Sequence, residues 1–155
     1  MFTFTIMKEK ESKYKEILPQ AVVLLEGESD DVARMANLAA LLHSAFGFWW
    51  TGFYRVVGNE LILGPFQGPV ACIRIPFGRG VCGAAWERGE TVVVPDVDRF
   101  PGHIACSSES RSEIVVPVRR AGIVRAVLDI DSRDLSTFDD TDRKYLEQIL
   151  EAVFR

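Results

Sequence analysis

Residues 112–131 read SEIVVPVRRAGIVRAVLDID, and this stretch decides the fold. Two runs rich in β-branched residues, 112–118 and 123–131, flank an Arg-Ala-Gly turn signal, so the pattern predicts an antiparallel hairpin. Alternation along the second run assigns four apolar side chains to the core face of the sheet: Val124, Ala126, Leu128 and Ile130. Asp129 and Asp131 then lie together on the opposite face.

The length of the turn decides which acidic residue stands beside Asp129. A three-residue turn with Gly122 in the left-handed conformation would pair Arg119 with Ile123. In that register Glu113 lies directly opposite Asp129. Like charges at directly opposite positions destabilise a sheet.

Glu113, Asp129 and Asp131 therefore form an expected acidic cluster. Three carboxylates within about 6 Å repel each other by roughly 2–3 kcal/mol per pair at an effective dielectric constant of about 20. A bound cation or a retained proton would relieve the repulsion, and groups perturbed in this way are candidates for a functional site. The alternative is a solvated sheet edge with Arg111 and Arg133 as counterions.

The rest of the chain supplies helices and further strands. Helical periodicity predicts a first helix that contains Pro19 and ends at Gly27. A second helix is expected to begin after a cap at Ser29-Asp30 and to end at Gly47. The expected later elements are strands at 49–57, 61–63, 70–75 and 91–94, a short helix after Gly80, an irregular segment at 95–111 and a closing helix that starts near Ser136-Thr137. This order predicts an α+β fold: a single domain over residues 1–155, with helices on one face of an antiparallel sheet and a ligand site on the other.

Composition narrows the class of protein. The chain has 155 residues, of which 48% are hydrophobic, with a net charge of -4 and a pI near 5.2. These values fit one domain with its own core and argue against nucleic-acid binding and against a polybasic membrane anchor. The uncharged residues 35–54 are interpreted as a helix followed by a strand rather than a membrane span. With an odd number of cysteines and no secretory leader recognised, a reducing, cytoplasmic location is expected.

The three cysteines are candidate reactive groups. Cys106 lies in the irregular segment near His103 and two serines, so it is a candidate nucleophile. Cys82 lies among apolar residues of the short helix, which suggests a buried thiol, and Cys72 lies on the polar face of its strand. The alternative for each cysteine is an inert, small hydrophobic residue. Neither Cys-x-x-Cys nor His-x₃₋₅-His spacing occurs, so no metal site is expected.

Aromatic residues mark a further candidate site. Alternation along WTGFY, residues 50–54, puts Trp50, Gly52 and Tyr54 on one face, where Gly52 leaves a gap flanked by two rings. Ordinary packing of the sheet is the alternative explanation for these aromatic side chains.

Four runs of the sequence carry a family resemblance: WTGFY (50–54), LILGPFQGPVACIRIPFGRGVCGAA (61–85), VPDVDRFPGHIACSSESRSEIVVPV (94–118) and VLDIDS (127–132). In order and spacing, over nearly the whole chain, they resemble the free methionine-(R)-sulfoxide reductases, which are stand-alone GAF domains. The resemblance implies a GAF fold and the thiol-dependent reduction of free methionine (R)-sulfoxide to methionine.

The resemblance also implies roles for the cysteines. Cys106 corresponds to the catalytic cysteine, Cys72 to the resolving cysteine, and Cys82 to a third, less essential thiol. Attack by Cys106 would leave a sulfenic acid, with which Cys72 condenses to a disulfide. An external dithiol, expected to be thioredoxin, would restore the pair. No cofactor is implied, and a homodimer is an expected assembly.

The remaining matched positions form the implied substrate site. Glu113, Asp129 and Asp131 match an acidic cage that can hold the substrate ammonium, and a carboxylic acid kept protonated there, Glu113, can protonate the sulfoxide oxygen. Trp50 and Tyr54 match the aromatic wall of the cage. Three positions depart from the family pattern, and they are Trp49, Pro69-Val70 and Ser107. The alternative functions are a GAF sensory module that binds a small ligand and an enzymatically inactive redox sensor.

Overall fold

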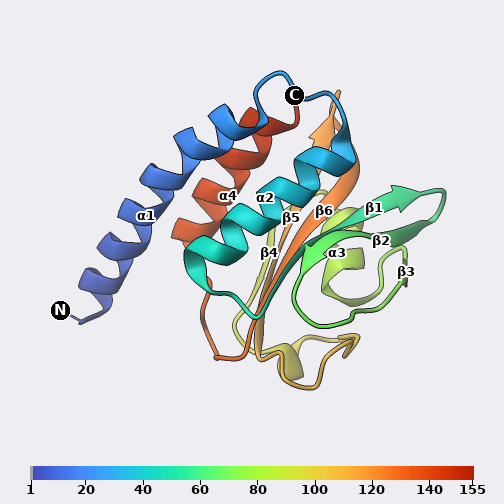
Figure 1. Cartoon of the computed structure of the whole chain (residues 1–155). Helices are drawn as coiled ribbons and strands as arrows, with labels where there is room; N and C mark the ends of the chain where they lie inside the picture. The colour runs from blue at the N-terminus through green and yellow to red at the C-terminus, as the bar shows by residue number, and fades with distance from the viewer. Residues whose placement is uncertain (1) are drawn as a thin grey trace.

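The computed structural model describes residues 2–155, which form one six-stranded antiparallel sheet with four α-helices (Figure 1). In chain order the elements are α1 (Phe2–Leu25), α2 (Asp31–Phe46), β1 (Trp50–Val57), β2 (Glu60–Gln67), β3 (Arg74–Pro76), α3 (Gly80–Arg88), β4 (Val92–Val94), the 3₁₀-helix η1 (Val97–Arg99), β5 (Ser112–Arg120), β6 (Ile123–Ser132) and α4 (Asp140–Val153). The strand order in the sheet is β3-β2-β1-β6-β5-β4.

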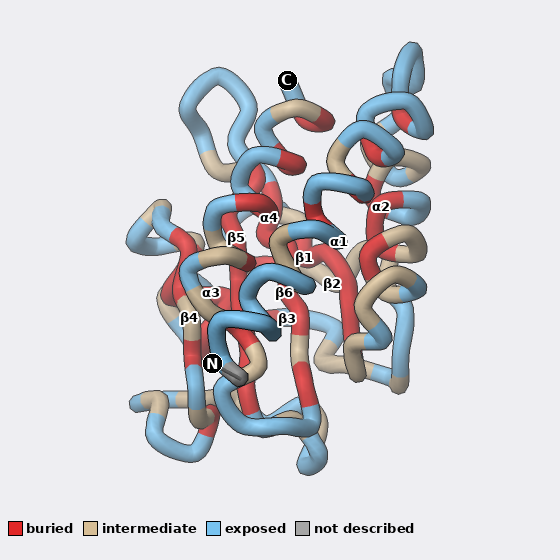
Figure 2. Tube along the Cα trace, turned by 90° about the vertical axis from the view of Figure 1, so that its left-hand side faces the viewer, coloured by how far each residue is buried: buried red, intermediate tan, exposed pale blue. Residues whose placement is uncertain are grey.

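The two faces of the sheet carry different layers. The helices α1, α2 and α4 cover one face, where their apolar side chains pack with Phe53, Ile114 and Leu128 (Figure 1). The short helix α3 packs on the other face with Tyr54 and Val115. Figure 2 shows the resulting burial along the central strands and on the inner turns of the helices. The predicted α+β fold is confirmed, with the addition that α3 lies on the face expected to hold the ligand.

The predicted helix ends are confirmed at α2 and wrong at α4. Asp30 caps α2 by accepting a backbone hydrogen bond at 3.0 Å, and Gly47 ends the helix with a φ of +67°. The helix α4 begins after the predicted Ser136-Thr137 signal, because Asp139 is its N-cap and forms a capping box with Asp142.

Among the described residues, no helix combines the length and the apolar character needed to cross a membrane.

A buried polar cluster docks α1 on α4. Asp142, which is 1% exposed, accepts hydrogen bonds from the Tyr14 hydroxyl at 2.6 Å and from the Lys10 ammonium at 2.7 Å. Burial raises the pKa of Asp142, while both partners act to lower it. The buried carboxyl group therefore has both a counterion and a hydrogen-bond donor within the chain.

The turn between β5 and β6 is shorter than predicted. It has two residues, Ala121-Gly122, with φ angles of +54° and +78°, and it pairs Arg120 with Ile123. Positive φ at both central residues is the geometry of a type I′ hairpin turn. The predicted pairing of Arg119 with Ile123 is therefore wrong, and Arg119 pairs with Val124 instead.

A bulge in the same hairpin then changes which acidic residues face each other. The register shifts between Val118 and Arg119, so that Glu113 lies opposite Asp131 and Asp129 lies opposite Val115. The predicted pairing of Glu113 with Asp129 is wrong, because the turn and the bulge each change the register. Directly opposite residues still share a face, so all three acidic side chains lie on the α3 side of the sheet.

Residues 68–73 form a loop where the sequence predicted a strand at 70–75. The strand β2 extends through Gln67, and only Arg74–Pro76 pairs beside it as β3. Gly68 has a φ of +127° and Pro69 lacks an N–H to donate to a ladder, so the chain leaves the sheet at this point.

Candidate active site

A pocket with a cavity volume of about 50 Å³ lies on the α3 face of the sheet. Its walls come from β1, α3, β5, β6 and the loops at 68–73 and 95–111. The residues predicted for the site that line it are Trp50, Tyr54, Cys82, Cys106, Glu113, Asp129 and Asp131. Cys72 is joined to this pocket through its bond to Cys106.

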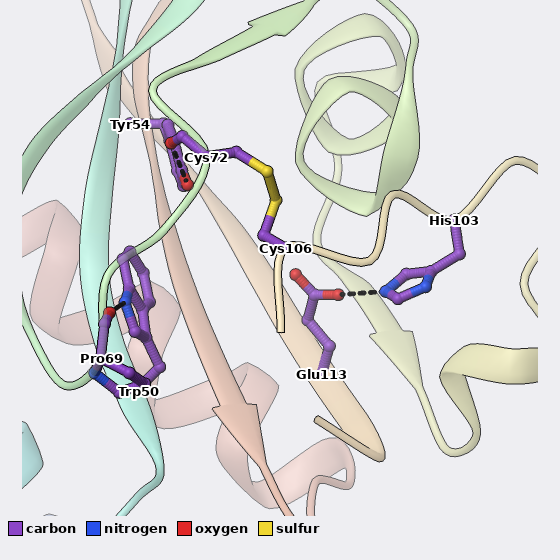
Figure 3. Close-up of a disulfide and its surroundings, with 7 residues drawn as sticks. All are labelled: Trp50, Tyr54, Pro69, Cys72, His103, Cys106 and Glu113. Atoms are coloured by element: carbon purple, nitrogen blue, oxygen red, sulfur yellow. Dashed lines mark hydrogen bonds and ion pairs between the residues drawn. A yellow bond between two sulfur atoms is a disulfide. The ribbon is translucent and has the colours of Figure 1, made fainter. Parts of the chain in front are cut away.

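Cys72 and Cys106 form a disulfide that joins the two loops (Figure 3). Their Cα atoms lie 5.4 Å apart, although 34 residues separate them in the sequence. Cys106 is exposed and Cys72 is half-buried, so the bond is accessible to a dithiol from solution. Cys82, in the first turn of α3, is the free cysteine and is buried, and burial raises the pKa of its thiol.

Two aromatic side chains of β1 hold the loop that carries Cys72. The indole Nε1 of Trp50 donates a hydrogen bond to the Pro69 carbonyl at 3.0 Å (Figure 3). The hydroxyl of Tyr54 donates to the Cys72 carbonyl at 2.9 Å. The aromatic wall of the pocket therefore also fixes the backbone of the cysteine loop.

The gap expected above Gly52 is filled by an indole ring. A Cβ on Gly52 would stand 2.6 Å from the Trp50 ring. That ring stacks with Tyr54 and Phe66 at centroid distances of 5.9 and 5.2 Å. The absent side chain at Gly52 thus lets Trp50 lie against the strand, which differs from the predicted opening between two rings.

The acidic residues are buried together at the base of this face. Glu113 and Asp129 are each 6% exposed, and Asp131 is half-buried. Burial raises the pKa of all three carboxyl groups, and Asp129 raises the pKa of Glu113 and Asp131 further. Hydrogen bonds from Glu113 and Cys82 lower the pKa of Asp129 against the effect of its burial. The acidic cluster therefore favours retention of a proton, because the pKa of both Glu113 and Asp129 is raised.

One oxygen of this cluster lacks a partner. Within the described part of the chain, Asp129 Oδ1 is buried and accepts no hydrogen bond. Buried polar atoms in native proteins are nearly always hydrogen-bonded, so an unpartnered oxygen at a pocket wall marks a position for a ligand atom.

His103 joins the acidic cluster, and sequence reasoning had placed it only near Cys106. Its Nε2 lies 3.8 Å from Glu113 Oε1 (Figure 3). Burial lowers the pKa of His103 despite nearby carboxylates, which favours the neutral imidazole at pH 7. The sequence signal that could have identified His103 was its position three residues before Cys106, in a loop that lines the pocket.

Two of the positions that depart from the family pattern contact each other. Trp49 Nε1 donates a hydrogen bond to Ser107 Oγ at 3.4 Å, and the guanidinium carbon of Arg133 lies 4.4 Å from the centroid of the Trp49 ring. This contact ties the residue after Cys106 to the start of β1.

Comparison with known families defines the class of protein. The GAF domain profile matches residues 30–153. The chain is therefore a GAF-domain protein, with its pocket between the sheet and α3.

Individual relatives narrow the family. GAF domain-containing protein A of Dictyostelium discoideum is 55% identical over 145 residues, which cover 93% of this chain and 92% of that protein. Free methionine-R-sulfoxide reductase of Saccharomyces cerevisiae is 43% identical over 152 residues, which cover 90% and 84%. The X-ray structure of free methionine-R-sulfoxide reductase from Neisseria meningitidis in complex with its substrate is 55% identical, with a TM-score of 0.91 over 93% of this chain and 87% of that one. This chain belongs to the free methionine-R-sulfoxide reductase family.

Proposed function

We propose that this chain reduces free methionine (R)-sulfoxide to methionine, with electrons from the thiols of Cys72 and Cys106. The observation that carries the proposal is a disulfide between Cys72 and Cys106 at the wall of a pocket with buried acids. Such a pocket suits a small molecule that carries both an oxidised sulfur and an ammonium group. The related protein from Neisseria meningitidis, at 55% identity, was crystallised in complex with its substrate.

The acidic cluster binds the substrate ammonium. Asp129 offers a buried oxygen that has no hydrogen-bond partner among the described residues, and Asp131 lies next to it on the same face. Each charge-assisted hydrogen bond to the ammonium is worth about 1.5–3 kcal/mol. Trp50 and Tyr54 form the aromatic wall against the apolar part of the substrate.

The reduction step uses Cys106 and Glu113. The Cys106 thiolate attacks the sulfoxide sulfur, and protonated Glu113 gives its proton to the sulfoxide oxygen. The oxygen, with that proton, ends on Cys106 as a sulfenic acid, and methionine leaves with two more electrons on sulfur. The raised pKa of Glu113 supports its role as the acid, because burial and the neighbouring Asp129 favour its protonated form.

Resolution of the sulfenic acid uses Cys72. Its thiol attacks the Cys106 sulfur, water leaves, and the disulfide forms. A dithiol reductant, for which thioredoxin is the expected protein, reduces the exposed disulfide by exchange. This cycle needs a reducing compartment, so we place the protein in the cytoplasm.

We extend the proposal to the whole chain as one domain and to a homodimer. The helix α1, which precedes the matched residues 30–153, contributes Tyr14 and Ile17 to the same buried core as the sheet. Val23 and Val32 are 70% and 54% exposed near the connection between α1 and α2, so a second copy could cover them.

The experiment is a comparison of free and N-acetylated methionine sulfoxides, with resolved epimers and a thioredoxin-coupled assay. The N-acetyl group removes the ammonium, and the loss of two charge-assisted hydrogen bonds should lower kcat/KM roughly 10²–10⁴-fold. Only the free (R)-epimer should be reduced efficiently. Equal efficiency on both forms would indicate repair of sulfoxides within proteins, and binding without turnover would indicate a sensor.

A further inference from the structure

Cys82, Glu113 and Asp129 bring three metal-binding atoms together from three different segments. The Cys82 Sγ and one carboxyl oxygen from each acid all lie within 4.8 Å of one another, and all three residues are buried. Zinc with bonds of about 2.0–2.3 Å holds tetrahedral ligands roughly 3.3–3.7 Å apart. Small side-chain rotations would therefore bring these atoms to coordinating positions.

A separate observation shows that this cluster has capacity for a cation. Asp129 is 6% exposed, lines the pocket, and keeps Oδ1 buried without a hydrogen-bond partner among the described residues. Neither Asp129 nor Asp131 forms an ion pair with any part of the chain that the structure describes. A cation at this position would satisfy both the oxygen and the excess of acidic groups.

A fourth donor stands beside the cluster. His103 Nε2 lies 3.8 Å from Glu113 Oε1, and Figure 3 shows the Glu113 carboxyl group between His103 and Cys106. Sulfur, imidazole and carboxylate together are a zinc-type ligand set, whereas magnesium and calcium prefer oxygen alone.

We propose that Cys82, Glu113, Asp129 and His103 form a binding site for a thiophilic divalent cation, Zn²⁺ in particular. The cation binds to the oxygens that we assign to the substrate ammonium, so it is a competitive inhibitor. The proposal of metal binding depends on the four side chains alone. Only the proposed competition between the metal and the substrate depends on the proposed function. No sequence pattern indicated this site, because its donors lie at positions 82, 103, 113 and 129 and lack any short metal-binding spacing.

Cobalt binding to the disulfide form tests the site directly. Three cysteines are present, and with Cys72 bonded to Cys106 the only thiol left is Cys82. Co²⁺ added to the oxidised protein should therefore give a thiolate-to-cobalt charge-transfer band in the near ultraviolet, and Zn²⁺ should displace it. Binding without this band would overturn the proposal.

Variants assign the ligands. Cys82→Ser should abolish the charge-transfer band, and Glu113→Gln should weaken Zn²⁺ binding by more than the roughly 10–100-fold typical of residues outside the coordination shell. Glu109→Gln changes an exposed acid of the neighbouring loop and should leave the affinity unchanged. If Cys82→Ser fails to fold, the Zn²⁺ affinities of Glu113→Gln and of its control Glu109→Gln test the site. Equal Zn²⁺ affinities of these two variants would overturn the proposed site.

Competition is measured separately. Free methionine sulfoxide should lower the apparent Zn²⁺ affinity of the oxidised protein, and N-acetylmethionine sulfoxide should not. Zinc that binds with undiminished affinity in saturating free sulfoxide would overturn the competition. Turnover of metal-free protein tests the proposed reductase function independently of either result.

Discussion

Asp142 and Asp129 are buried aspartates on opposite sides of the same sheet, and their surroundings differ. Asp142 has the Lys10 ammonium at 2.7 Å and the Tyr14 hydroxyl at 2.6 Å. Asp129 lies among other acids and keeps one buried oxygen without a partner in the described structure. The comparison separates two uses of a buried charge: the helix side satisfies it within the chain, and the pocket side leaves it for a ligand.

The largest effect on the pocket side should come from the cysteine pair. Cys106→Ser should abolish single-turnover release of methionine, because no other exposed thiol of the described chain lines the pocket. Cys72→Ser should release about one methionine per chain and then stop as the sulfenic acid, since only resolution is lost. Rapid-quench analysis of methionine measures both, and continued turnover by Cys106→Ser would show the assignment to be wrong.

Asp129→Asn tests the pocket-side half of the comparison. We expect methionine sulfoxide to bind about 10–150-fold more weakly, from the loss of one charge-assisted hydrogen bond worth about 1.5–3 kcal/mol. The free energy of unfolding should be unchanged or higher, because a buried carboxylate without a counterion disappears. Calorimetric titration and urea denaturation measure the two quantities, with exposed Asp134→Asn as the control.

Asp142→Asn should show the opposite pattern. It leaves the Lys10 ammonium, whose side chain is 15% exposed, without its buried counterion. We expect the free energy of unfolding to fall by about 2–4 kcal/mol, while KM and kcat of the folded protein stay the same. Asp140→Asn is the matched control, since that side chain is 98% exposed and the change should stay within about 0.5 kcal/mol. A loss of activity without a loss of stability would contradict the comparison.

The smallest expected effect is a change in pH dependence. Burial and Asp129 raise the pKa of Glu113 in the folded state above its unfolded value of about 4.3. The folded state then holds a proton that the unfolded state releases, so this contribution to stability is complete in acid and is lost as the pH rises through the folded pKa.

Glu113→Gln removes that titration. The Tm of Glu113→Gln relative to the wild-type Tm should therefore rise as the pH increases above the unfolded value of about 4.3, whereas exposed Glu109→Gln should follow the wild type at each pH. Thermal denaturation at several pH values gives the difference, and a constant offset between Glu113→Gln and wild type would show that Glu113 ionises normally.

The sequence supported the fold where local signals act alone. The Asp30 cap, the Gly47 stop and the alternation from Ala126 to Ile130 in β6 each depend on a few neighbouring residues, and the structure confirms them. Val124, which the same alternation placed on the core face, packs on the α3 face instead, because the bulge interrupts the alternation. The strand expected at 70–75 failed because Gly68 and Pro69 release the chain from the sheet, which an apolar run does not reveal.

The sequence predicted which face of the sheet carries the acidic residues of the site, but it did not predict which residues pair across the strands. Alternation placed Asp129 and Asp131 on the pocket face correctly, but the shorter turn at Ala121-Gly122 and the bulge between Val118 and Arg119 together moved Glu113 from its predicted partner Asp129 to Asp131. A one-residue insertion in a ladder has no distinct sequence signature here. Contacts between distant segments, such as Lys10 with Asp142, were also beyond sequence patterns, because 132 residues separate the two.

The Cys72–Cys106 disulfide makes the heat resistance of the protein depend on its place in the catalytic cycle. The bond closes a loop across 34 residues, which by chain entropy alone should stabilise the oxidised form against unfolding by roughly 4 kcal/mol. Thermal denaturation with and without a dithiol should therefore give a higher midpoint for the oxidised chain. The protein is thus least resistant to unfolding in the reduced state, the state that is ready for substrate.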